Sequence, residues 1–253
     1  MSRRLLVVLA FLSVTIIAAG CGGSAPPPAE EAPAAAPAPP PAVSAGAHLA
    51  EHFTKIREVE EAIIRGDIES AKAPAQWIAD HQETAGLPAG TENYVIEMKS
   101  AAKAVGATDD IGNAAVAAAK AVSSCGACHA AAKVTPKLPD EAAPADTSGT
   151  TGHMRKHQYA VNLMYRGLMA PSQDLWTKGA EALKASPLTE KDLTKVTKEI
   201  VVFEARVHEL ADRAAKAPDT GAKIAIYGEI IGGCATCHGL HGKVWGPGLP
   251  KTN

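Results

Sequence analysis

The feature that most constrains this chain is a five-residue motif that occurs twice, once near the middle and once near the end. A Cys-x-x-Cys pair followed directly by His spans residues 125–129 and again residues 234–238. A Cys-x-x-Cys pair alone is compatible with a zinc site, a redox dithiol or a small disulfide. The repeated His calls for a chemistry that uses two thiols and one imidazole at this spacing.

Covalent attachment of haem c is a chemistry that uses this spacing. On a helix, Cys at positions i and i+3 and His at i+4 lie on one face. Two thiols then form thioether bonds to one porphyrin edge, while the imidazole offers the iron its proximal ligand. The predicted thioether residues are Cys125, Cys128, Cys234 and Cys237, and the predicted proximal ligands are His129 and His238. A zinc site built from the four thiols and a thioredoxin-like dithiol remain as alternatives.

The N-terminal residues have the pattern of an export signal. Arg3 and Arg4 precede an apolar stretch, and small residues at 19–20 come directly before Cys21. The stretch is too short and wrongly flanked for a membrane span. Its end resembles the lipobox of bacterial lipoproteins, which implies lipidation of Cys21 and a signal peptide over 1–21. We expect a lipid anchor on the inner or outer membrane facing the periplasm, or on the cell surface; simple secretion is the alternative.

Composition divides the rest of the chain into four segments. Residues 22–46 are rich in Pro and Ala and cannot build a core, so we predict a tether there. A second stretch rich in Pro, Ala, Ser and Gly, at 136–151, predicts a linker. The linker separates a first haem-binding unit, residues 47–135, from a second one, residues 152–253, which ends in a Gly/Pro-rich tail. Each unit contains one Cys-x-x-Cys-His motif.

Both units are predicted to be all-α. Aromatic residues make up 4% of the chain, Ala is abundant, and alternating runs of β-branched residues are absent. Leu49, Phe53 and Ile56 begin an amphipathic stripe at helical spacing. Thr189 and Asp219 are candidate N-caps. The further predicted helices span residues 68–82, 91–105, 109–133, 153–168, 171–185, 189–217 and 219–240.

The two units also share short landmarks that indicate an internal duplication. Two His four residues apart open each unit, and an Arg-Gly pair and a Trp follow. The matched landmarks are 48–53 with 153–158, 64–66 with 165–167, and Trp77 with Trp176. The spacing between the first two landmarks differs by about one helical turn between the units.

Four helices with Cys-x-x-Cys-His near the end of the last one resemble the cytochrome c-prime family of haem bundles. The resemblance covers the chain twice and implies two tandem four-helix bundles, each with its haem site in its last helix. An irregular two-haem helical fold is the alternative. In that family the residue on the distal side of the iron comes from the first helix. Some members have Met there, and others leave the iron open and bind gases.

Both first helices of this chain carry His at i and i+4. His52 and His157 lie within the apolar stripes, so we predict them as distal iron ligands. The alternative ligands are His48, His153 and Met154. Solvated or hydrogen-bonded histidines with open irons are a further possibility. His81 and His208 are expected on helix surfaces.

The predicted function is electron transfer by a diheme c-type cytochrome with two His ligands on each iron. Two imidazoles fill both axial positions and leave no place for a substrate. A gas-binding or sensory haem protein with an open distal site is the alternative. No catalytic residue is identified, so we do not expect an enzyme, although peroxidase-like activity stays open. The expected partners are redox proteins and, through the lipid, a membrane; the net charge of −2 gives no indication of nucleic acid.

Overall fold

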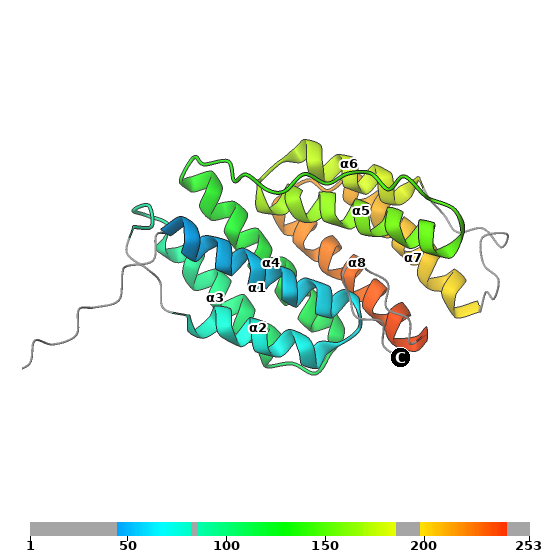
Figure 1. Cartoon of the computed structure of the whole chain (residues 1–253), viewed down its shortest axis with the longest axis horizontal. Coiled ribbons are helices and arrows are strands. Elements are labelled where there is room, and N and C mark those ends of the chain that lie inside the picture. The colour runs from blue at the N-terminus through cyan, green and yellow to red at the C-terminus, as the bar shows by residue number, and fades with distance from the viewer. Residues whose placement is uncertain (1–44, 82–85, 186–197, 242–253) are drawn as a thin grey trace, which may run out of the picture. The chain divides into compact units, whose positions relative to one another are not determined.

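Eight α-helices make up the regular structure of the described part of the chain (Figure 1). The computed structural model describes residues 45–81, 86–185 and 198–241, all within one compact unit. No strand occurs in these ranges, so the all-α prediction is confirmed for them. The helices are α1 Ala45–Ile64, α2 Ile68–Asp80, α3 Glu92–Gly106, α4 Ile111–Ala131, α5 Gly149–Met169, α6 Gln173–Lys184, α7 Lys198–Ala215 and α8 Thr220–His241.

The predicted signal peptide, Cys21, most of the tether, the cap at Thr189 and the C-terminal tail lie outside the described residues. None of the eight helices is both long enough and apolar enough to cross a bilayer. The 136–151 segment, predicted to be a linker, ends in α5, which begins at Gly149.

Several helices begin at a side chain that accepts a hydrogen bond from the first turn. Asp67 accepts from the Ser70 amide at 3.1 Å and starts α2, and Asp110 does the same for α4. Asp219 accepts from the Ala222 amide at 2.7 Å, which confirms this predicted cap. Such caps satisfy backbone N–H groups that have no partner within the helix.

The helices contact one another in two groups of four, and the two groups also contact each other. Within α1–α4, each helix packs on the next, and α1 also packs on α4. The α5–α8 group repeats this pattern, with α5 also against α8. Between the groups, α4 lies along α8, α4 contacts α5, and α1 contacts α8.

The close approach of α4 and α8 depends on small residues. Most of the buried surface of α4 consists of Ala. A Cβ added to Gly228 of α8 would lie 2.8 Å from Cα of Val116 in α4. A Cβ added to Gly126 of α4 would lie 2.0 Å from the carbonyl oxygen of Leu168 in α5. Larger side chains at these two positions would separate the groups.

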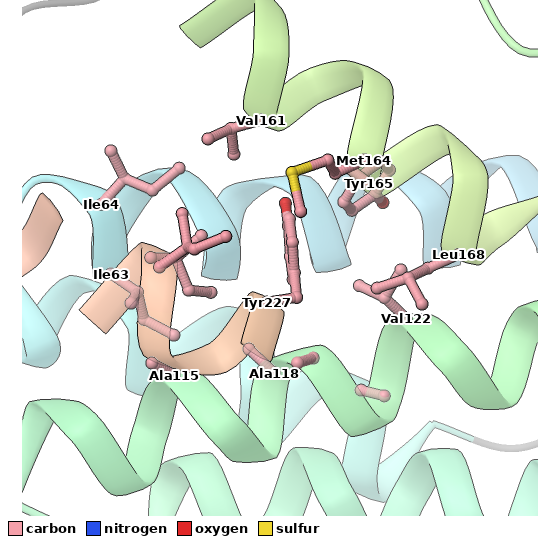
Figure 2. Close-up of a cluster of buried hydrophobic side chains, with 14 of the residues drawn as sticks. Ile63, Ile64, Ala115, Ala118, Val122, Val161, Met164, Tyr165, Leu168 and Tyr227 are labelled. Carbon is pink, nitrogen blue, oxygen red and sulfur yellow. The ribbon is translucent and has the colours of Figure 1, made fainter. Parts of the chain in front are cut away.

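Large side chains fill the space where the two groups meet. Tyr227 of α8 is fully buried, and Figure 2 shows it between Met164 and Tyr165 of α5 on one side and Ala118 of α4 on the other. Trp176 of α6 is also fully buried and donates its indole N–H to the Ala214 carbonyl at 2.8 Å.

The segment between α4 and α5 is held against α5 by polar contacts. Asn162 of α5 donates to Glu141 at 2.9 Å, and Arg166 of α5 lies 4.0 Å from Asp140. The side chain of Leu138 packs against the core. This segment, which composition predicted to be a linker, is therefore fixed to the second group of helices.

The internal repeat has a simpler register than the landmarks suggested. The caps of α2 and α6, Asp67 and Ser172, are 105 residues apart (172 minus 67). The same offset relates His52 to His157. The Arg-Gly pairs at 65–66 and 166–167 are 101 residues apart (166 minus 65), and Trp77 and Trp176 are 99 apart (176 minus 77), so neither of these landmarks shares the offset. The histidine pairs of α1 and α5 and the caps of α2 and α6 are therefore the features that repeat at 105 residues.

Candidate functional site

Each Cys-x-x-Cys-His motif lies near the end of a helix: 125–129 in α4 and 234–238 in α8. All four thiols are free. Burial, and after it the second thiol of each motif, raises the pKa of Cys125 and of Cys234 to about 12. A redox dithiol needs a lowered thiol pKa, so this environment argues against that alternative.

The four thiols also do not gather into one metal site. All four lie in the described residues, and no group of three or more potential metal ligands found among those residues includes a Cys. A four-thiol zinc site requires all four sulfurs within bonding distance of one ion. The geometry therefore argues against the zinc alternative.

The imidazole of each motif is held by the opposite group of helices. His129 Nδ1 lies 2.8 Å from the carbonyl oxygen of Met169, the last residue of α5. His238 Nδ1 lies 2.6 Å from the carbonyl oxygen of Ile64, the last residue of α1. Since a carbonyl only accepts, Nδ1 carries the proton in both rings, and Nε2 becomes the ligating nitrogen. Met169 and Ile64 are again 105 residues apart, so the two contacts are equivalent under the repeat.

The first His cluster consists of His48, His52 and His81. Their potential ligand nitrogens all lie within 4.8 Å of one another. His48 and His52 share one face of α1, because residues four apart are neighbours on a helix. His81 follows α2 directly, with Nε2 3.1 Å from Nδ1 of His48. The Trp77 ring stacks on the His81 ring at a centroid distance of 4.0 Å.

The second cluster consists of His153, His157 and Glu204. The first two lie on α5 at the same spacing as the pair on α1, and Glu204 comes from α7. The Glu204 Oε1 atom lies 2.9 Å from His153 Nε2 and 3.6 Å from His157 Nε2. His208, one turn after Glu204, has its Nε2 2.8 Å from the same oxygen. A carboxylate therefore occupies the centre of this cluster.

Burial and charge set the protonation of the second cluster. Burial, together with the charge of His153, lowers the pKa of His157 to about 3, although Glu204 opposes this shift. Burial acts to raise the pKa of Glu204, but hydrogen bonds with His153 and His208 hold it below its ordinary value. His157 is thus a neutral imidazole at pH 7, which is the form that binds a metal.

Each cluster lies at the same end of its helix group as a Cys-x-x-Cys-His motif. Helices joined by short turns run antiparallel, so the starts of the first and third helices meet the ends of the second and fourth (Figure 1). In the second group, His238 is near enough to His157 to lower its pKa, and the Glu204 charge raises the pKa of Cys237 after the larger effect of burial. In the first group, Cys128 shares a hydrogen bond with Thr91, the residue before α3.

The predicted distal residues are buried and lie in the two clusters. His48, His52, His153 and His157 are between 2% and 7% exposed, and Met154 is half-buried. The expectation that His81 and His208 are surface residues was wrong, because both lie against cluster rings. Sequence reasoning missed Glu204. Its spacing of four residues from His208 was the available signal.

Comparison of this chain with protein-family models, with curated proteins and with solved structures found no match. A functional interpretation therefore depends on the motif spacing and on the geometry of the two clusters. Both arrangements provide buried nitrogen ligands, and the described residues contain possible metal-binding groups of His and Glu.

Proposed function

We propose that this chain is a diheme c-type cytochrome that carries electrons at the cell envelope. The observation that carries the proposal is the repeated pairing, at one end of each helix group, of a Cys-x-x-Cys-His motif with a buried His pair. Haem c, once bound, supplies an iron that alternates between the ferric and ferrous states. The residues that would hold it are Cys125, Cys128 and His129 at the first site, and Cys234, Cys237 and His238 at the second.

The residues fit this group in two respects. Both proximal imidazoles donate Nδ1–H to a backbone carbonyl, an arrangement that fixes ring orientation and increases ligand basicity. The four thiols are free, and burial raises the pKa of each, so they are available for thioether bonds and are not activated for disulfide exchange.

We further propose that α1–α4 and α5–α8 are two tandem four-helix bundles. The contact pattern supports this, since in each group every helix packs on its sequence neighbour and the first packs on the fourth. A rigid bundle around an iron limits the structural change that accompanies electron transfer. His129 contacts Met169 of the second bundle, and His238 contacts Ile64 of the first. These two contacts support the proposal that the two bundles act as a single unit.

His157 is the proposed distal ligand of the second site. Its Nε2 is buried and lies 3.6 Å from Glu204 Oε1, and the charge of His238 is near enough to lower the pKa of His157. His153 instead approaches Glu204 at 2.9 Å, so its nitrogen already has a partner. By the repeat, His52 is the proposed distal ligand of the first site, and His48, whose Nδ1 is engaged with His81, is its orienting neighbour.

Two imidazoles on each iron suit a carrier better than a gas sensor. His129 with His52, and His238 with His157, would hold the irons and leave no open position for a gas, and irons held by two imidazoles have lower potentials than those with a Met ligand. The partners would be one-electron donor and acceptor proteins, and no catalytic role is proposed. The electron paramagnetic resonance spectrum of the oxidised holoprotein tests this, with two low-spin ferric signals expected. High-spin signals from both irons, together with rapid CO binding after reduction, would contradict it and favour a gas-binding protein.

We also propose that the protein is exported and anchored through a lipid on Cys21. The support is the sequence alone: the basic and apolar leader, the small residues before Cys21, and the Pro-rich tether that follows. The Cys21→Ser variant is expected to move from the membrane fraction to the soluble periplasmic fraction while keeping its visible spectrum. An unchanged membrane fraction would contradict the lipid anchor.

A further inference from the structure

A buried carboxylate lies where the two helix groups meet. Glu60 of α1 is 1% exposed. It accepts hydrogen bonds from the phenol of Tyr227 in α8 and from the guanidinium of Arg57 in α1. Arg57 also donates to Asn162 at 3.3 Å, and its guanidinium lies 4.8 Å from the centre of the Tyr165 ring. We name Arg57, Glu60, Tyr165 and Tyr227 the junction network.

Burying this ion pair has a large desolvation cost, and an apolar pair of similar size would serve packing as well or better. Figure 2 shows apolar side chains that pack around Tyr227, among them Met164 and Ala118. Stability alone therefore does not explain a carboxylate here. A buried carboxylate would be explained if it compensated a change of charge nearby.

The junction network lies between the two proposed haem sites. Along α1, Glu60 is eight residues after His52 and four before Ile64, whose carbonyl holds His238. At 1.5 Å per helical residue these steps are about 12 Å and about 6 Å. The network also approaches the attachment cysteines, because Glu60 raises the pKa of Cys234 and Cys125 raises that of Tyr165, in both cases after burial and other groups.

The titratable groups that face Glu60 include one other carboxylate, Glu61, which is 49% exposed. From α1 these are Arg57 and Glu61, from α5 Tyr165, and from α8 Tyr227 and Cys234. Burial raises the pKa of Glu60, although Arg57 and the Tyr227 hydrogen bond oppose this. Arg57 keeps its proton at all accessible pH values. Burial also raises the pKa of both phenols, so they stay neutral.

We propose that Glu60 takes up a proton when the irons are reduced, an inference that rests on the proposed diheme function. One electron from a donor protein converts one ferric iron to ferrous, and one proton from solvent adds to the Glu60 carboxylate. Transfer of that electron to an acceptor protein reverses both events. The cation of Arg57 then remains to offset the added electron, so the net charge of the low-dielectric junction does not change. The effect is larger at the second site, which is nearer along α1.

Redox titration of the full-length holoprotein at a series of pH values tests this proposal. Reduction becomes harder as protons become scarcer, so the wild-type midpoint potential falls with rising pH. Glu60 binds a single proton, so the slope approaches about 59 mV per tenfold change in proton concentration for one electron at the second site, and it is shallower where two electrons share that proton. In Glu60→Gln, which preserves shape and removes the titrating group, this slope is lost. The matched control is Glu61→Gln, because Glu61 is the adjacent carboxylate on α1 and is 49% exposed; it keeps the slope.

Infrared difference spectra give a second readout. Reduction of the wild type is expected to produce a protonated-carboxyl C=O band that shifts in D2O and is absent in Glu60→Gln. If Glu60→Gln does not fold, Tyr227→Phe provides the test. Loss of the Tyr227 hydrogen bond raises the pKa of Glu60. The pH range over which the midpoint potential changes therefore moves to higher pH.

Measuring covalently bound haem first separates a failure of the proposed function from a failure of the role of Glu60. A preparation without haem counts against the proposed function. Reversible haems whose midpoints have the same pH slope in wild type and Glu60→Gln, or an unmoved window in Tyr227→Phe, overturn the role of Glu60 alone.

Discussion

The two clusters share a histidine pair at the same register but differ in the group that completes them. At the first, His81 and the Trp77 ring stacked on it complete the cluster with aromatic rings. At the second, Glu204 supplies a carboxylate that contacts three histidines. Both clusters therefore have a histidine pair on the first helix of their group. They differ in charge, because only the second cluster contains a carboxylate, that of Glu204 in α7. If the proposed haems are present, we expect the two iron sites to differ in potential, with the lower potential at the site beside Glu204.

The largest effect is expected from removing one pair of attachment thiols. Cys125→Ala/Cys128→Ala should lose one covalent haem, and Cys234→Ala/Cys237→Ala should lose the other, because each pair serves only its own site. Intact-mass measurement counts the haems. Cys21→Ser is the matched control and keeps both, since the fifth Cys lies outside the motifs. A thiol-pair variant that kept two haems would break the assignment.

Removing one distal ligand should change the spin state of one iron and leave that of the other unchanged. His52→Ala is expected to change half of the low-spin signal to high-spin, and His157→Ala should change the other half. Spin resonance of the ferric proteins measures this. Met154→Leu should alter neither iron. If His48→Ala or His153→Ala reproduced the loss instead, the ligand would be the other member of the pair.

Adding a methyl group where α8 packs on α4 should lower the stability of the whole protein. Gly228→Ala places a methyl group 2.8 Å from the Val116 backbone, so the free energy of unfolding should fall by about 1–3 kcal/mol. Gly46→Ala is the matched control, because nothing lies within 4 Å of the added carbon. Urea unfolding of the holoproteins measures the difference. Equal stability of the two variants would mean that α4 and α8 do not pack as closely as described.

The smallest effect isolates the charge that distinguishes the clusters. Glu204→Gln removes a negative charge that favours the ferric state, so the potential of the second site should rise while that of the first stays constant. A unit charge about 6 Å away at an effective dielectric of about 20 corresponds to roughly 2.8 kcal/mol, or about 120 mV. Spectroelectrochemical titration resolves the two midpoints. Equal shifts at both sites, or none, would remove Glu204 as the cause of the asymmetry.

The sequence was sufficient to predict the features that depend on residues close together along the chain. Helical periodicity predicted the helices, and the cap at Asp219 followed from residue type. The position of His52 and His157 in an apolar stripe predicted their burial. These are local properties, because a helix fixes which residues share a face.

Features that depend on how helices pair were not predictable in this way. The contact between His129 and Met169 joins residues 40 apart, and that between His238 and Ile64 joins residues 174 apart. Glu204 was missed for the same reason, since only the packing of α7 on α5 brings it to His153. Composition also gave no indication of how the segment before α5 is held, because Asp140 and Glu141 contact residues of α5 that lie more than about 20 positions further along the chain.

The intact mass of the mature wild-type protein, purified from a host that attaches haem c, tests the central claim most directly. Covalent haem at both Cys-x-x-Cys-His motifs predicts a mass that exceeds the processed chain by two haem groups and survives denaturation. A mass equal to the processed chain alone would contradict the account at both sites.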